Sequence, residues 1–245
     1  MALNGRASNK ETRTEGVRAR LICPPAYKDK FLMSTCIVGV SVGQLAHEGV
    51  KFEETIKCIS RRFKNCIIAV SDSLQRHSLS IGTQYSAEEL HEEANKKGKA
   101  WVSRNSHILQ RATIPIKIYH WDKWLLRHDY KLNHEMILQK YKQNSEFKSA
   151  MDKTIADYIV RLKGNFGCEG VPSNAIANSF DYLAEECAIV MLMWQEIGVE
   201  FVVYTSDILP VMRSAHNLFV DKKSGLLLEW VRIKLKTKTR IVEKA

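Results

Sequence analysis

The sequence predicts an α/β fold in which a mainly parallel sheet is flanked by helices. Short uninterrupted apolar runs, typical of strands buried on both faces, alternate with longer segments whose apolar residues recur at helical spacing. No internal repeat or low-complexity linker divides the 245 residues, so we expect 31–245 to form a single domain. Residues 1–30 are polar and basic, and we expect them to form a disordered arm.

The first predicted unit is a strand, a helix and a second strand. The runs "STCIVGVS" (34–41) and "NCIIAVSD" (65–72) are the two apolar strands. The segment between them, 50–63, carries four apolar residues at helical spacing: Phe52, Ile56, Ile59 and Phe63. This order predicts two parallel strands joined by a right-handed crossover.

A long helix is predicted over 86–112. Ser86 is its expected N-cap, and Glu89 completes a capping box. The run "TIPIKIYHW" (113–121) predicts a third strand, and two or three helices are expected over 122–163.

The remaining third of the chain predicts one more helix and two strands. The helix is expected to begin at N-cap Ser173, directly after Pro172, and to stop at Gly198. The run "VEFVVYTSD" (199–207) predicts a fourth strand, and "SGLLLEWVRIKL" (224–235) a late one.

The net charge of +10 is unevenly distributed. Residues 96–163 contain fifteen Lys and Arg but only six Asp and Glu. Such a basic segment indicates a polyanionic partner such as nucleic acid, although ordinary solvated helix faces also explain it.

The cysteines and histidines indicate no metal site. The six cysteines form no C-x-x-C pair and no disulfide framework, so we expect core residues in a reducing cytoplasm: Cys23, Cys36, Cys58, Cys66, Cys168 and Cys187. The eight histidines are scattered, and we expect no metal. The sequence shows neither a secretory signal nor an apolar run of the roughly 18 to 20 residues that would span a bilayer.

The first predicted strand ends in Gly39-Val40-Ser41-Val42-Gly43, which satisfies the nucleophile-elbow pattern of serine hydrolases. Ser41 would then lie at the carboxyl edge of the sheet, where open α/β sheets bind ligands. A tight turn without chemistry explains the pattern equally well. A hydrolase would also need a triad, for which Asp207 and His216 are available, although the surrounding "SAHNLFV" (214–220) also fits the start of a strand.

A serine without a triad needs a substrate that is already activated. The sequence contains neither a G-x-x-x-x-G-K-[ST] loop nor a G-x-G-x-x-G loop, so no ATP or dinucleotide site is indicated. The segment "DYLAEE" places Tyr182 and Glu186 four residues apart on one helical face. A carboxylate there suits the binding or deprotonation of an amine, and a purely structural pair is the alternative.

Together these motifs resemble the tRNA-dependent cyclodipeptide synthases over nearly all of residues 30–235. The motifs are "GVSVGQ", "IIAVSDSLQRH", "HWDKW", "FDYLAEE" and "FVVYTSD", in the order and spacing of that family. The resemblance implies a Rossmann-like domain similar to the catalytic domain of class I tyrosyl- and tryptophanyl-tRNA synthetases, without their ATP signatures. It also implies two aminoacyl-tRNA substrates, no cofactor, no membrane association and a cytoplasmic monomer.

The resemblance also implies roles for individual residues. Ser41 would carry the aminoacyl and then the dipeptidyl group, and Tyr182 and Glu186 would hold the amino group. Tyr204 would relay a proton during cyclisation to the 2,5-diketopiperazine. Four further residues correspond to positions around the aminoacyl group: Ile37, Gly39, Gln44 and Ala69.

Two positions bear on the subfamily. Gln44 stands where one branch has asparagine, so the chain resembles the other branch, and Thr205 matches neither common pattern. The family's tRNA-binding helix corresponds to 88–111, with these contact candidates: Lys96, Lys97, Lys99, Arg104 and Arg111. A serine esterase that uses Ser41 and a non-catalytic tRNA-binding protein remain the alternatives.

Overall fold

The computed structural model describes residues 12–166, 170–220 and 228–242. Its centre is a six-stranded sheet with the strand order β1-β6-β5-β2-β3-β4. The strands are β1 (Thr12–Ile22), β2 (Thr35–Val40), β3 (Asn65–Val70), β4 (Ile116–His120), β5 (Phe201–Tyr204) and β6 (Glu229–Val242). All neighbouring pairs are parallel except β1 and β6, which are antiparallel. The predicted fold class is therefore confirmed.

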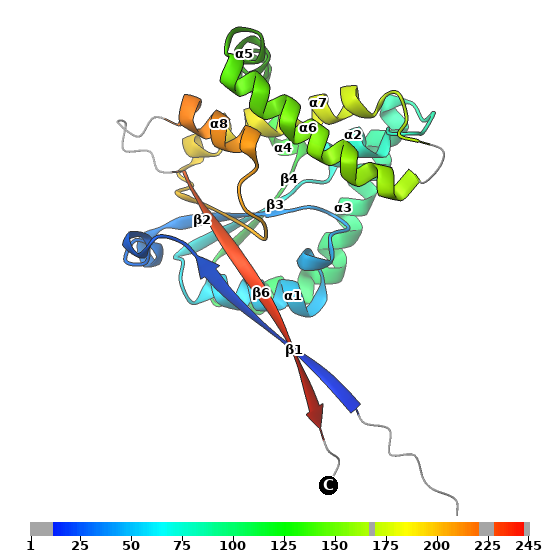
Figure 1. The fold of residues 1–245 in the computed structure, drawn as a ribbon. Helices are drawn as coiled ribbons and strands as arrows, with labels where there is room; N and C mark the ends of the chain where they lie inside the picture. The colour runs from blue at the N-terminus through cyan, green and yellow to red at the C-terminus, as the bar shows by residue number, and fades with distance from the viewer. Residues whose placement is uncertain (1–11, 167–169, 221–227, 243–245) are drawn as a thin grey trace, which may run out of the picture.

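Helices cover both faces of the sheet (Figure 1). One face carries α1 (Gly49–Ser60) and α3 (Ala87–Gln110). The opposite face carries α4 (Asp122–Leu125), α5 (Tyr130–Gln143), α6 (Ser145–Phe166), α7 (Ala175–Cys187) and α8 (Pro210–Phe219). The short helix α2 (Arg76–Leu79) contacts both α3 and α7.

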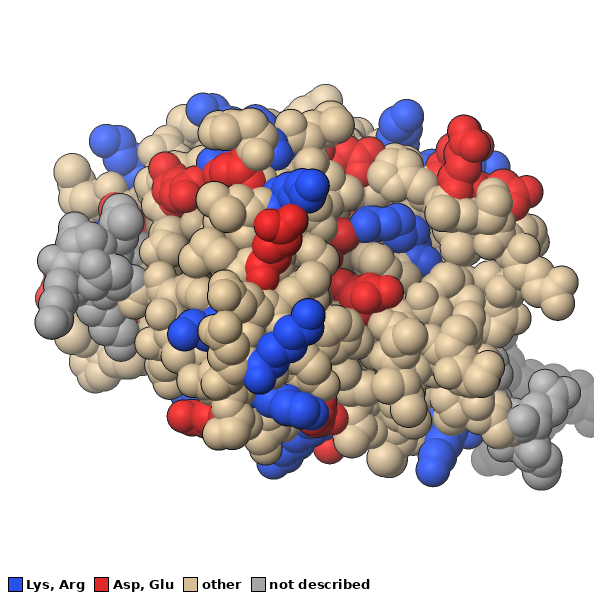
Figure 2. Space-filling model, turned by 90° about the horizontal axis from the view of Figure 1, so that it is seen from above, with Lys and Arg blue, Asp and Glu red and all other residues tan. Residues whose placement is uncertain are grey.

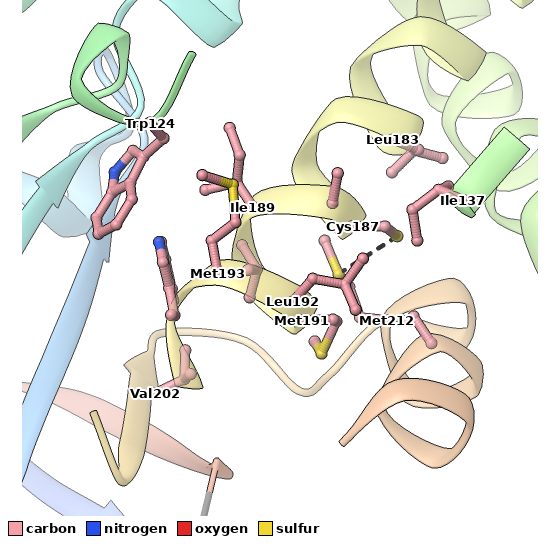
Figure 3. Close-up of a cluster of buried hydrophobic side chains, with 14 of the residues drawn as sticks. Trp124, Ile137, Leu183, Cys187, Ile189, Met191, Leu192, Met193, Val202 and Met212 are labelled. Carbon is pink, nitrogen blue, oxygen red and sulfur yellow. Dashed lines mark hydrogen bonds between the residues drawn. The ribbon is translucent and has the colours of Figure 1, made fainter. Parts of the chain in front are cut away.

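The sheet separates two hydrophobic cores because successive side chains of a strand point to opposite faces. In β2, Cys36 and Val38 pack with α1 and α3, whereas Ile37 packs with the helices of the other face. Figure 3 shows this second core, where residues of α7 and α8 meet and the Cys187 Sγ lies 3.7 Å from the Met212 Sδ.

Local sequence signals mark two of the helix ends that the sequence predicted. The predicted capping box of α3 is confirmed, because the Glu89 N–H donates to the Ser86 Oγ and the Ser86 N–H donates to the Glu89 carboxylate. The helix expected to run from Ser173 to Gly198 instead has three parts. Its N-cap is Asn174 rather than Ser173, and α7 continues as a π-helical segment, Ala188–Met193, followed by a 3-10 turn. Gly198 ends this segment as predicted, with a φ of 73° that favours glycine.

The prediction of a disordered arm over 1–30 is wrong for the part that the structure describes. Residues Thr12–Ile22 form β1, which pairs with β6 from Ile22↔Arg232 to Thr12↔Val242. Val17, Ala19 and Leu21 are half-buried and alternate with exposed residues, as expected of a strand with one covered face. Residues 1–11 lie outside the described part of the chain.

The cysteines fit the expected structural role where the structure describes them. Four are buried and Cys23 is half-buried, and none of these five forms a disulfide; the buried ones are Cys36, Cys58, Cys66 and Cys187. Cys168 lies outside the described residues. Within the described residues, no helix is both long and apolar enough to cross a bilayer, and no cluster of three or more His, Cys, Asp or Glu is suited to hold a metal.

Candidate active site

A cavity of about 360 Å³ lies at the carboxyl ends of β2 and β5, on the face covered by α5 to α8. Its wall includes Ser41, Tyr182, Glu186 and Tyr204, the four predicted catalytic residues. Residues from the turn after β2, from α7 and from the end of β5 therefore meet in one place, although they are far apart in sequence.

Ser41 follows β2 directly and opens a turn rather than a helix. The Gln44 N–H donates to the Ser41 carbonyl at 3.2 Å, and Gly43 has a φ of 89°, which few other residues adopt. The Ser41 Oγ lies 2.8 Å from the Tyr204 hydroxyl. Burial raises the pKa of Tyr204, and hydrogen bonds from Ser41 and Gln44 oppose that shift. Tyr204 is therefore a neutral hydroxyl that can exchange a proton with the serine.

Tyr182 and Glu186 lie one helical turn apart on α7 and both border the cavity. Enclosure and, to a smaller extent, the negative charge of Glu185 together raise the pKa of Glu186 to about 8. Among the described residues, no hydrogen bond or ion pair reaches the Glu186 carboxylate. A carboxylate of this kind is suited to an incoming cation such as an ammonium group.

The remaining predicted substrate residues divide into two pairs. Gly39 and Gln44 border the cavity, and a Cβ built on Gly39 would lie 3.4 Å from the ring of Tyr204. Ile37 and Ala69 face the same side of the sheet but are fully buried in the core, outside the cavity wall. The structure therefore brings the first pair to the cavity and leaves the second beneath it.

The triad of the esterase alternative is not assembled. The Asp207 carboxylate pairs with Arg232 at 2.6 Å. His216 lies in helix α8, where the "SAHNLFV" segment also fitted a strand start, and its Nε2 contacts the Leu228 carbonyl at 2.8 Å. Among the described residues, no imidazole reaches the Ser41 Oγ, whose hydrogen-bond partner is Tyr204.

Two neighbours of the site were not predicted from the sequence. Glu185 is buried and accepts hydrogen bonds from Arg76, Trp121 and Tyr130, and it contacts His77 at 3.3 Å. Burial opposes ionisation, but hydrogen bonds from His77 and Arg76 lower the pKa of Glu185 to about 2.

His47 is the second such neighbour, with its Nδ1 3.0 Å from the Ser41 amide nitrogen. The spacing of His47 from Ser41 carries no motif that would have revealed this contact.

The five basic residues predicted to bind tRNA are all exposed, four of them on α3 and Arg111 at its C-cap. Two have acidic partners: Lys97 lies 3.4 Å from Glu93, and Arg104 lies 2.9 Å from Glu48. Lys96, Lys99 and Arg111 form no ion pair with any residue that the structure describes. The face formed by α5 to α8 differs, because Figure 2 shows Lys and Arg interspersed there with Asp and Glu.

A second basic surface lies on β1 and β6, which extend away from the body as a two-stranded ribbon (Figure 1). Cations at alternate positions share one face of this ribbon, because Arg20 is paired with Lys234 and Arg18 with Lys236. Trp230 belongs to the same face of β6 and borders the cavity, so the basic face leads away from the cavity mouth. The alternation of Lys and Arg over 232–240 is the sequence signal that would have revealed it.

Comparison with known proteins shows the family. No family model and no curated protein sequence matches the chain. Among solved structures, a cyclodipeptide synthase from Fluoribacter dumoffii is 32% identical, with a TM-score of 0.87, and the match covers 92% of this chain and 100% of that one.

Two more distant structures share the fold. A cyclodipeptide synthase from Candidatus Glomeribacter gigasporarum, bound to Phe-tRNA, is 19% identical, with a TM-score of 0.68 and coverage of 86% of this chain and 90% of that one. A Mycobacterium tuberculosis protein that relates cyclodipeptide synthetases to type I tRNA synthetases is 16% identical, with a TM-score of 0.63 and coverage of 96% and 99%. From the identity and coverage of the Fluoribacter match, the chain belongs to the cyclodipeptide synthase family.

Proposed function

We propose that this protein joins the amino acids of two aminoacyl-tRNAs into a 2,5-diketopiperazine through a covalent intermediate on Ser41. One observation carries this proposal. A serine paired with a tyrosine hydroxyl at 2.8 Å shares its cavity with Glu186, a carboxylate that has no partner among the described residues. The cavity thus offers a nucleophile, a proton carrier and a binding site for an amino group.

In the first step, the Ser41 Oγ attacks the ester carbonyl of the first aminoacyl-tRNA. A new ester to serine forms, the ester bond to the terminal ribose breaks, and the serine proton passes through Tyr204 to the leaving ribose hydroxyl. Glu186 and Tyr182 hold the amino group of the substrate. The tRNA ester is already activated, so this exchange depends on positioning more than on a strong base.

In the second step, the amine of the seryl ester attacks the ester of the second aminoacyl-tRNA. A peptide bond forms and the ester bond to the second ribose breaks, while Glu186 takes a proton from the attacking amine and passes it to the leaving ribose hydroxyl. The free amine of the dipeptidyl ester then attacks the carbonyl bound to Ser41, which closes the six-membered ring. The serine oxygen leaves and regains a proton through Tyr204.

The turn after Ser41 supplies candidate donors for the oxyanion of each step. Among the described residues, the amide groups of Val42 and Gly43 have no acceptor, whereas the Gln44 amide is used within the turn. Backbone donors of this kind stabilise tetrahedral intermediates without a metal.

The basic face of the β1–β6 ribbon and the exposed cations of α3 are the proposed contacts for the tRNA phosphates. The ribbon is well placed because its basic face begins at Trp230, beside the cavity in which the aminoacyl end would react.

The proposal is tested by mixing the protein with total bacterial tRNA charged with a mixture of amino acids. We expect diketopiperazines in the products and an aminoacyl adduct on Ser41 in intact-protein mass spectra. Ser41→Ala should abolish both, because the acyl group loses its attachment point. An adduct on another residue would overturn the assignment of Ser41, and tRNA binding without any acyl transfer would favour a non-catalytic role.

A further inference from the structure

We infer that His47 is a positioning residue for Ser41: its neutral imidazole holds the backbone of the nucleophile through Nδ1. This inference rests on the proposed function. His47 ends a 3-10 turn, Leu45–His47, between the Ser41 turn and α1, and only 2% of its surface is exposed.

The first contact joins the His47 Nδ1 to the backbone of Ser41. Nδ1 lies 3.0 Å from the Ser41 amide nitrogen and 3.3 Å from the Ser41 carbonyl oxygen. We assign the shorter contact as a hydrogen bond donated by the Ser41 N–H, which leaves Nδ1 unprotonated and puts the proton of the neutral ring on Nε2. Burial lowers the pKa of His47, which favours this neutral ring at physiological pH.

The second contact joins His47 to the partner of the nucleophile. The imidazole lies against the ring of Tyr204, with 5.5 Å between the ring centroids. One side chain therefore touches both members of the Ser41–Tyr204 pair. The backbone hydrogen bond holds the main chain of Ser41 in the position from which its Oγ reaches the Tyr204 hydroxyl.

His47 is itself held from the other side of the sheet. Its carbonyl accepts a hydrogen bond at 2.8 Å from the Nε1 of Trp101, a fully buried residue of α3. The next residue, Glu48, accepts from Arg104 and Asn105 of the same helix. The turn that carries the nucleophile is thus tied through His47 to the longest helix of the described structure.

The surroundings of Nε2 indicate that the His47 imidazole does more than fill space in the core. It is buried and has no hydrogen-bond partner among the described residues. A buried N–H without an acceptor destabilises a fold, so an apolar ring would suit this place better if packing were its only role. The hydrogen bond to Ser41 is the contact that an apolar ring cannot make.

Two substitutions separate packing from positioning. His47→Phe keeps a flat ring against Tyr204 but removes the acceptor, whereas His47→Asn can offer an amide oxygen close to the position of Nδ1. At saturating charged tRNA we expect His47→Phe to slow formation of the Ser41 adduct by about 100-fold, the scale of a misplaced reacting group. His47→Asn should recover at least a tenth of the wild-type rate, and the affinity for tRNA should stay unchanged in both.

His216→Phe is the matched control, because it also removes one contact between an imidazole and the backbone, but in α8 and outside the cavity wall. It should leave the rate of adduct formation at the wild-type value. A wild-type rate in His47→Phe, with the adduct on Ser41, would overturn the role of His47 alone. Absence of any adduct in the wild-type protein would overturn the proposed function itself.

A measurement that needs no activity gives a second test. In ¹⁵N spectra of the folded protein labelled at histidine, His47→Asn identifies the His47 signals by their disappearance. We expect Nδ1 to be the unprotonated nitrogen and Nε2 the protonated one. Protonation of Nδ1 at neutral pH would overturn the inference, because that nitrogen could not then accept from Ser41.

Discussion

Glu185 and Glu186 are neighbours in α7, yet their carboxylates have opposite surroundings. Glu185 is enclosed by four donor groups and its pKa falls to about 2, whereas Glu186 has no partner among the described residues and its pKa rises to about 8. Consecutive helical residues point about 100° apart, so one carboxylate enters the protein and the other enters the cavity. The first serves the fold, and the second is available to a ligand.

We expect Glu185→Gln to affect stability and Glu186→Gln to affect turnover. Glu185→Gln removes the charge that compensates Arg76 and should lower the free energy of unfolding by about 3 kcal/mol, the scale for breaking a buried ion pair. Glu186→Gln should leave the fold intact and lower turnover by about 100-fold or more. Chemical denaturation and initial rates measure the two effects. Wild-type turnover in Glu186→Gln would show that this carboxylate is not used.

Adduct formation should depend on the ionisation of Glu186. Its pKa lies near 8, so the carboxylate that binds an ammonium group becomes populated as the pH rises, and the rate should climb between about pH 6 and 8. The rising limb should be absent in Glu186→Gln. Single-turnover rates at constant ionic strength give the profile, and a limb that persists in the variant would assign the titration to another group.

The same shift has a consequence for stability. A carboxyl whose pKa rises from 4.5 when unfolded to about 8 when folded binds more protons in the folded state, so its contribution decreases as the pH rises between these values. Glu186→Gln should therefore be more stable than wild type at pH 8, by about 1 to 3 kcal/mol, and equal to it below pH 4. Thermal unfolding at both pH values tests this, and an equal difference at both would contradict it.

Tyr204→Phe removes the hydroxyl beside Ser41 but keeps the ring that packs against Gly39 and His47. We expect the adduct to form on Ser41 about 100-fold more slowly, because the proton relay is lost while the nucleophile remains. Rapid-quench mass spectrometry measures the rate. Adduct formation at the wild-type rate would show that a group other than Tyr204 transfers the proton.

Two glycines in helices give a matched pair of stability predictions. A Cβ on Gly98 of α3 would lie 2.3 Å from the Cβ of Asp72, whereas a Cβ on Gly164 of α6 would meet nothing within 4 Å. Gly98→Ala should destabilise the protein by more than about 2 kcal/mol through overpacking. Gly164→Ala should stabilise it by about 0.5 to 1 kcal/mol. Urea unfolding distinguishes the two, and equal effects would contradict the close approach of α3 to Asp72 in the segment after β3.

The two basic surfaces can be separated by the salt dependence of tRNA affinity. Alanine at Lys96, Lys97 and Lys99 should reduce the slope of log affinity against log salt by about two units, because each phosphate contact contributes roughly 0.7 to 0.9. Alanine at Arg20 and Lys234 on the ribbon should reduce it by about 1.5 units. Unfolding should change little, since exposed cations contribute little to stability. A surface whose variant keeps the wild-type slope does not contact tRNA.

The sequence correctly predicted the strands whose residues are buried on both faces and the helix whose N-terminus carries a capping motif. The strands β2 and β3 are buried on both faces, so their apolar runs were unmistakable, and Ser86 and Glu89 marked the start of α3. β1 was missed because its exposed face is polar and cationic, which hid the alternation of Val17, Ala19 and Leu21. The pattern of a one-sided strand at the edge of a sheet resembles that of a disordered basic segment.

The site was predicted only where its residues belong to sequence motifs. Ser41, Tyr182, Glu186 and Tyr204 belong to motifs, and the structure brings all four to one cavity. His47 and Arg76 act through contacts that depend on how the turn after β2 and the helix α2 pack. Such contacts produce no recognisable spacing in the sequence. Ile37 and Ala69 show the opposite case: they belong to motifs, yet they are buried in the core behind the cavity wall.

The pairing of β1 with β6 brings residues 12–22 against 232–242, almost the whole length of the chain apart. On the ribosome, β1 has no strand to pair with until the chain between Ile22 and Glu229 and then β6 itself have been made. Contacts between such distant segments form slowly, and an unpaired strand invites wrong partners in the meantime. The β1 edge is therefore the last part of this sheet that translation allows to form, and the cations of β1 keep the unpaired strand soluble.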